Sequence, residues 1–167
     1  MRTRFRLGLA LLSVVIAVFV AGFAAAASIA PEFVGAGSTR YAMVARGPLD
    51  TTTTQSSTFV NITGLSVVIG IPSGKTAELI INFSGEVNSC DVMYVRAVVD
   101  GAAAGPSETQ LQYRIGQNLG ADSHSFTFYK KGVGAGSHTV AMQWHGLTTC
   151  DHQFMAARSM IVTANIH

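Results

Sequence analysis

The sequence contains few charged residues. Only 12% of its 167 residues are charged, with 11 lysines and arginines against 9 acidic residues and a formal net charge of +2. Lys130 and Lys131 form the only adjacent basic pair. Proteins that bind nucleic acid concentrate lysine and arginine on one face or in one stretch. The low and scattered charge therefore excludes nucleic acid as a partner.

The sequence also lacks the short signatures of common hydrolases, because G-x-S-x-G, S-x-x-K and H-E-x-x-H do not occur in it. Its acidic residues are few, although the carboxylate separation that matters for glycoside hydrolysis is spatial. Gly132, Gly134 and Gly136 do not make a phosphate loop, because a strand pattern rather than a helix follows them. We therefore expect a protein that is not an enzyme and uses no cofactor.

Cysteine is scarce, with only Cys90 and Cys150 in the chain. A secreted chain with one pair most simply forms one disulfide. That disulfide would close a loop of about 60 residues and stabilise the fold by roughly 4 kcal/mol, less any strain. The alternative is a pair of free or metal-bound thiols, which the absence of a C-x-x-C spacing disfavours.

The one long apolar run lies at the N-terminus. Arg2, Arg4 and Arg6 precede an uncharged apolar stretch from Leu7 to Ala21, and a cluster of small residues ends at Ala27. This order is typical of a cleaved secretory signal peptide, and an uncleaved anchor helix is the alternative. Removal of the three arginines changes the formal charge from +2 to −1. We expect the protein to be secreted, and so extracellular or periplasmic.

The remaining chain divides at a polar stretch. Residues 1–27 are expected to be the signal peptide, 28–57 an N-terminal segment or linker, and 58–167 a β-sandwich domain. The polar run TTTTQSS, Thr51–Ser57, reads either as linker or as the start of an edge strand, because threonine favours pleated surfaces.

Short runs of alternating apolar and polar residues recur from Thr58 onward and predict strands. The expected strands are Thr58–Ile62, which Gly64 ends, Ser66–Ile71, Ala77–Glu86, Asp91–Asp100, Thr109–Ile115, two strands within Ser125–Leu147, Phe154–Arg158 and Met160–Ile166, with a further short one at Tyr41–Ala45. No amphipathic helix pattern accompanies them. Eight or nine short strands with turn residues between them are typical of an antiparallel sandwich or barrel.

The stretch Ser125–Leu147 is expected to form a β-hairpin. Phe126 and Phe128 share one side of its first strand, Val140 and Trp144 share one side of its second, and a glycine-rich turn separates the two. A hairpin cannot bury its apolar face alone, so a second sheet must cover it. Trp144 is expected in the core.

Three polar residues adjoin the cysteines and suggest a weak metal or ligand site. Asp91 follows Cys90, and Asp151 and His152 follow Cys150, so a disulfide would bring them together. Carboxylate oxygens with one imidazole suit Ca²⁺ or Zn²⁺. The alternative is that these are solvated loop residues. His138 is expected at the start of a strand, bonded to the backbone of the turn.

A second candidate site is a polar and aromatic strand face. Tyr94 and Arg96 share one side of their strand, and Gln112 and Arg114 share one side of another. Such rows suit a sugar or a peptide. The alternative is a solvated outer face.

Several runs resemble a group of uncharacterised bacterial secreted β-sandwich proteins. The most specific are VRAVVDG, from Val95 to Gly101, and AGSHTV, from Ala135 to Val140, and the resemblance covers roughly residues 57–165. The order of these strands is also similar to jelly rolls of the C1q and tumour-necrosis-factor type. That likeness implies a jelly-roll sandwich and allows a homo-oligomer, most simply a trimer, although fold alone does not give function.

Together these observations predict a secreted, non-enzymatic β-sandwich module for extracellular binding or surface structure. Two alternatives stay open. One is a carbohydrate-binding module, and the other is a jelly-roll subunit that assembles into trimers. The expected partner is an extracellular glycan or protein.

Overall fold

The computed structural model describes residues 32–34, 39–47, 49–89, 91–112, 121–146 and 153–167. Within these ranges the chain forms eleven strands and no helix, so the predicted all-β class is confirmed. None of the described residues belongs to a helix long and apolar enough to cross a membrane. The expected signal peptide, residues 1–27, lies outside the described residues and stays a prediction.

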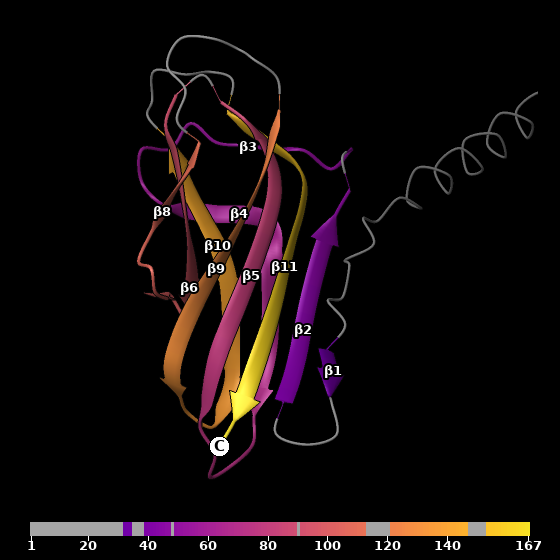
Figure 1. The fold of residues 1–167 in the computed structure, drawn as a ribbon, viewed down its shortest axis with the longest axis vertical. Coiled ribbons are helices and arrows are strands. Elements are labelled where there is room, and N and C mark those ends of the chain that lie inside the picture. Colours follow the sequence, from indigo (N-terminus) through magenta and orange to yellow (C-terminus); the bar gives the residue numbers. More distant parts are fainter. Residues whose placement is uncertain (1–31, 35–38, 48, 90, 113–120, 147–152) are drawn as a thin grey trace, which may run out of the picture.

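The strands form two antiparallel sheets whose long strands run along the longest axis of the molecule (Figure 1). The first sheet has the order β1 (Glu32–Val34), β2 (Thr39–Arg46), β11 (Phe154–Ile166), β5 (Ala77–Asn88) and β9 (Asp122–Val133), and β3 (Thr52–Thr53) pairs with β11. The second has the order β4 (Val60–Ile71), β10 (Gly136–Gly146), β6 (Met93–Val99) and β7 (Ala102–Ala103), and β8 (Thr109–Gln112) also pairs with β6.

The strand order is that of a jelly roll. Strands β2, β11, β5 and β9 lie side by side in one sheet, and strands β4, β10, β6 and β8 lie side by side in the other. Along the chain, every connection from β3 to β6 and from β8 to β11 crosses between the sheets, whereas β1, β2 and β3 stay in the first sheet and β6, β7 and β8 stay in the second. This double Greek-key arrangement confirms the predicted jelly-roll-like sandwich.

The core lies between the two sheets. Leu79, Ile81 and Phe83 of β5 and Met142 and Trp144 of β10 point inward and are at most 1% exposed. Successive residues along a strand face opposite sides of its sheet, so apolar residues two positions apart line the inner face of each sheet. The predicted core position of Trp144 is confirmed.

The expected hairpin over Ser125–Leu147 is wrong. Strand β9 pairs with β5 in the first sheet, and β10 pairs with β4 and β6 in the second. The glycine-rich turn therefore carries the chain from one sheet to the other, with Gly132 and Gly136 at positive φ. Phe128 and Trp144 still point into one core, but they do so from facing sheets.

Two expected strand breaks are irregularities of pairing inside longer strands. Gly64, at φ 74°, does not end a strand, because β4 continues through it, and Figure 1 shows β4 changing direction along its length. In β11 the pairing with β5 shifts register between Met155 and Arg158, so one strand replaces the two expected there. A bulge inserts an extra residue and bends the strand without ending it.

The sandwich begins before residue 58. Strand β2 pairs with β11 along Thr39–Arg46, and its Ala42 and Val44 belong to the core. Strand β3, within the polar run Thr51–Ser57, also pairs with β11. Residues 28–57, expected as an N-terminal segment or linker with a possible edge strand, therefore contribute strands to the first sheet.

Candidate functional site

The outer face of the second sheet gathers Tyr94 and Arg96 with residues from neighbouring strands. Both side chains are half-buried and point away from the core, while Val95 between them is fully buried. The pairing of β6 with β10 places Arg96 opposite Gln143 and Tyr94 opposite His145. Two cross-strand rows result, one polar and one aromatic.

The polar row is a chain of side-chain hydrogen bonds across three strands. Arg96 Nε donates to Gln143 Oε1 over 2.9 Å, and Gln143 Nε2 donates to Asn61 Oδ1 over 2.9 Å. Gln143 pairs with both neighbours in the backbone register, so its amide lies between them. Each bond restricts the next side chain, which fixes the direction of the Arg96 guanidinium.

The aromatic row lies beside the polar row. The Tyr94 and His145 rings are stacked, with centroids 4.9 Å apart and an interplanar angle of 12°. Phe59 meets His145 edge to face at 4.5 Å. The Arg96 guanidinium lies over the Phe59 ring, 3.9 Å from its centroid, in the geometry of a cation–π contact. We call these six residues the Arg96 face: Asn61, Gln143, Arg96, Phe59, His145 and Tyr94.

The described strands of this sheet carry one side chain with a permanent charge. The described strands of the second sheet contain no aspartate, glutamate or lysine, and Arg96 is their one arginine. Among the described residues, its terminal Nη1 and Nη2 groups have neither a hydrogen bond nor an ion pair. The face therefore presents donors, ring surfaces and one uncompensated positive charge.

Sequence reasoning identified only part of this face. Tyr94 and Arg96 were expected together, but Phe59, Asn61 and Gln143 were not. The position of Gln143 next to the core residue Trp144 indicates that it points outward, yet only the β6–β10 register shows that it reaches Arg96. Gln112 belongs to β8, where its backbone pairs with Met93, and Arg114 lies outside the described residues.

The expected site beside the cysteines falls mostly outside the described part of the chain. Cys90, Cys150, Asp151 and His152 lie there, so the disulfide and the metal or ligand site stay predictions. Asp91 precedes β6, and its Oδ1 accepts a hydrogen bond from the Val92 amide over 2.7 Å. The described residues contain no group of three histidine, cysteine or acidic side chains suited to hold a metal ion.

His138 ties the turn after β9 to the turn after β6. Its Nδ1 lies 2.7 Å from Asp100 Oδ2, and its Nε2 lies 2.9 Å from the Gly134 carbonyl oxygen. Asp100 Oδ1 also accepts a hydrogen bond from the Thr139 amide. Both ring nitrogens face acceptors, so only the doubly protonated imidazolium satisfies both. The expected bond from His138 to the backbone of the turn is present.

This pair predicts a pH-dependent contribution to stability. The hydrogen bond to Asp100 raises the pKa of His138, and the bond from His138 lowers the pKa of Asp100. The pair therefore stabilises the fold most between the usual pKa values of 3.8 and 6.5, less as rising pH deprotonates His138, and less as falling pH protonates Asp100. Both groups are partly exposed, so we expect an effect below about 1 kcal/mol.

Asp100→Asn tests this contribution, because asparagine also tolerates the positive φ of 49° at this position. Urea unfolding of both proteins at about pH 5 and about pH 8.5 measures the free energy of unfolding. The difference in the free energy of unfolding between the parent protein and the variant should be smaller at the higher pH. An equal deficit at both values would contradict an ionic role for the pair.

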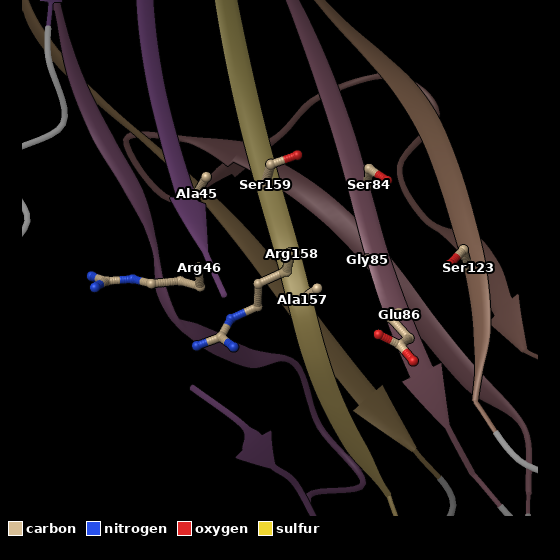
Figure 2. Close-up of a pocket in the computed structure, with 9 residues that line it drawn as sticks. All are labelled: Ala45, Arg46, Ser84, Gly85, Glu86, Ser123, Ala157, Arg158 and Ser159. Carbon is tan, nitrogen blue, oxygen red and sulfur yellow. The ribbon is translucent and has the colours of Figure 1, made fainter. Parts of the chain in front are cut away.

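A hollow of about 280 Å³ lies on the first sheet. Figure 2 shows its lining, and the guanidinium groups of Arg46 and Arg158 lie on the far side of β11 from Glu86. Ser84 and Ser159 line both this hollow and an adjacent one of about 210 Å³. The lining residues are Ala45, Arg46, Ser84, Gly85, Glu86, Ser123, Ala157, Arg158 and Ser159.

The arginines of this hollow already have partners. Arg158 is 3% exposed and donates to the carbonyl oxygens of Thr63, Asp50 and Ala156. Burial lowers its pKa, and the nearby Asp50 carboxylate opposes that shift. Arg46 lies 3.6 Å from Asp50 Oδ2 and donates to the Gly64 carbonyl oxygen. The hollow offers a ligand mainly small hydroxyl side chains and the Glu86 carboxylate.

No family model and no curated protein matches the chain. Among solved structures, the chain is similar to the CBM36-1 domain of a multidomain xylanase from the hindgut metagenome of Trinervitermes trinervoides, with 12% identity, a TM-score of 0.35 and coverage of 73% of this chain and 95% of that chain. It is also similar to a chain of infectious bursal disease virus strain Gx, with 14% identity and a TM-score of 0.39. That match covers 80% of this chain and 36% of the viral chain.

A third similar structure is an exo-beta-1,3-galactanase from Phanerochaete chrysosporium, with 12% identity, a TM-score of 0.27 and coverage of 74% of this chain and 32% of that chain. The chain thus spans about a third of the viral and the galactanase chains. Likenesses this distant say nothing of ligand or reaction. The assignment of the sandwich rests on its own strand order.

Proposed function

We propose that this chain is a secreted, non-enzymatic β-sandwich module that binds an extracellular carbohydrate through the Arg96 face. One observation carries the proposal: an aromatic row lies beside a hydrogen-bonded polar row on the outer side of a sheet. Binding sites typically combine ring and apolar surface with a few well-placed polar groups that fix orientation. Sugars have both apolar ring faces and hydroxyl groups, so the two rows suit them.

The absence of carboxylates from this sheet supports a binding role rather than hydrolysis. Most glycoside hydrolases place two aspartate or glutamate side chains on either side of the bond that they cleave. The described strands of the second sheet contain neither residue type. A ligand on the Arg96 face would meet donors and rings without a carboxylate pair from the strands beneath it.

Tyr94→Ala tests the proposal. Affinity electrophoresis of the mature protein against a panel of neutral and acidic polysaccharides identifies a ligand, and titration calorimetry then gives its affinity. We expect the affinity of the variant to fall by about tenfold or more, because it loses the stacked ring that forms one end of the aromatic row.

Tyr41→Ala is the matched control, because Tyr41 is 42% exposed on the first sheet and lies outside the Arg96 face. The control should bind as the parent does, and circular dichroism should show that both variants fold. The proposal fails if no polysaccharide retards the protein, or if the two variants weaken binding equally.

A further inference from the structure

We infer that the ligand of the Arg96 face is a carboxylate-bearing polysaccharide, anchored by the guanidinium of Arg96. This inference rests on the proposed carbohydrate binding and names the class of its ligand. It depends on three observations: the isolation of the positive charge, the fixed direction of the guanidinium, and the ring surface beside it. Each can be followed in the contacts of the described strands.

The positive charge of Arg96 has no ion-pair partner among the described residues. Three acidic residues flank the strands of the second sheet, and none of them forms an ion pair with Arg96 in the described structure. One of them, Asp100, is already bound to His138. A structural arginine normally has partners, as Arg158 does on its three carbonyl oxygens. Arg96 instead retains two terminal nitrogens for an external acceptor.

The guanidinium is held in one direction before any ligand arrives. Nε donates to Gln143, and Gln143 donates to Asn61, so the inner edge of the group is bonded to the sheet. The Phe59 ring lies against its face at 3.9 Å. The edge that carries Nη1 and Nη2 is the part left for binding. A guanidinium edge matches the two oxygens of a carboxylate, and prior orientation lowers the cost of ordering it.

The surroundings favour a sugar acid over a polyanion bound by charge alone. Polynucleotides and highly charged polymers require several cations along a strip, whereas Arg96 is the one lysine or arginine on these described strands. Tyr94 and His145 place ring surface two residues away from Arg96 and Gln143 along β6 and β10. One carboxylate on the arginine and one sugar ring against the aromatic row use both rows of the face.

The experiment compares two polymers with the same backbone. Polygalacturonate carries a carboxylate on each sugar, and fully methyl-esterified polygalacturonate is its neutral counterpart. Titration calorimetry of the mature protein should show binding of the acid form that weakens with added salt. The affinity for the ester should be lower by about tenfold or more, because esterification removes the carboxylate and with it the charge-assisted hydrogen bonds.

Three variants separate charge from geometry. Arg96→Gln should reduce binding of polygalacturonate to the level of the ester, and Arg96→Lys should give an intermediate affinity because it retains the charge without the planar pair of nitrogens. Lys75→Gln removes the same charge from an exposed turn outside this sheet and should leave binding unchanged. Unfolding curves check that the Arg96 variants fold.

The outcomes distinguish this inference from the function on which it rests. Equal binding of acid and ester by the parent protein, or equal losses from Arg96→Gln and Lys75→Gln, would overturn the carboxylate assignment. Carbohydrate binding would survive that result if a neutral polysaccharide binds and Tyr94→Ala weakens it. Absence of binding to every polysaccharide would overturn both. Tighter binding of dextran sulfate than of polygalacturonate would show that charge density, rather than a carboxylate, is recognised.

Discussion

Replacing Arg158 by methionine is expected to lower the free energy of unfolding by about 3–5 kcal/mol. The guanidinium is buried at the sandwich edge and donates to the carbonyl oxygens of Thr63 in β4, Ala156 in β11 and Asp50 in the preceding loop. Methionine retains most of the apolar stem but leaves these acceptors without a donor. A buried acceptor that loses its partner is costly because water does not replace the lost hydrogen bond.

Arg46→Met is the matched control for this prediction. Arg46 also donates to a carbonyl oxygen of β4 and lies near Asp50, but its side chain is 25% exposed, so water can replace what it loses. We expect the control to cost less than about 1 kcal/mol. Guanidinium-chloride unfolding followed by circular dichroism measures both variants. Similar midpoints for Arg158→Met and the parent protein would show that Arg158 does not hold the two sheets together.

Trp144→Ala is expected to destabilise the fold by about 3–5 kcal/mol. Trp144 is the one tryptophan of the chain, is 1% exposed, and lies on the inner face of β10 among the core residues of both sheets. Truncation removes its buried surface and leaves a cavity that a sandwich, with its hydrogen-bonded strands, closes only in part. In the parent protein the emission of Trp144 should be blue-shifted and poorly quenched by iodide.

Circular dichroism must follow this variant, because it has no tryptophan fluorescence. Tyr41→Ala again serves as control, since an exposed aromatic residue on the outer face should change stability by no more than about 0.5 kcal/mol. Strong iodide quenching of the parent, or a midpoint for Trp144→Ala near that of the control, would contradict the inward position of Trp144. An exposed Trp144 would also make it a second platform for sugars.

Alternation along the sequence predicted the faces of the strands well. Leu79, Ile81 and Phe83 lie two residues apart in the strand predicted over Ala77–Glu86, and all three are in the core. Alternation says nothing about which strand lies alongside, and for that reason the hairpin over Ser125–Leu147 was wrong. A glycine-rich turn serves both a hairpin and a crossing between sheets, and only long-range pairing decides between them.

Bulges account for the misplaced strand ends. Gly64 takes a positive φ, a conformation found both at strand ends and in bulges, so the residue type alone could not distinguish the two. In β11 the register shift between Met155 and Arg158 moves the side chains after it to the other phase of alternation. In the sequence alone, a strand whose alternation of apolar and polar residues is interrupted looks like two separate strands.

The candidate site was predicted only where one strand carries it. Tyr94 and Arg96 are two residues apart, so their common face follows from the period of a strand. Phe59, Asn61 and His145 join them from positions far away in the sequence. Their meeting depends on the pairing of β10 with β4 and β6, which no local pattern specifies. The chemistry of the face therefore became visible only with the register.

The position of β11 has a consequence for how the chain acquires its structure during synthesis. Strand β11 lies between β2 and β5, although it is translated after both of them. Until residues 154–166 leave the ribosome, the edges of β2 and β5 that β11 will pair with have no partner strand. These open backbone edges can pair with other chains. Productive folding of this half of the molecule therefore waits for β11, and nascent chains that stop short of it should depend on chaperones to avoid aggregation.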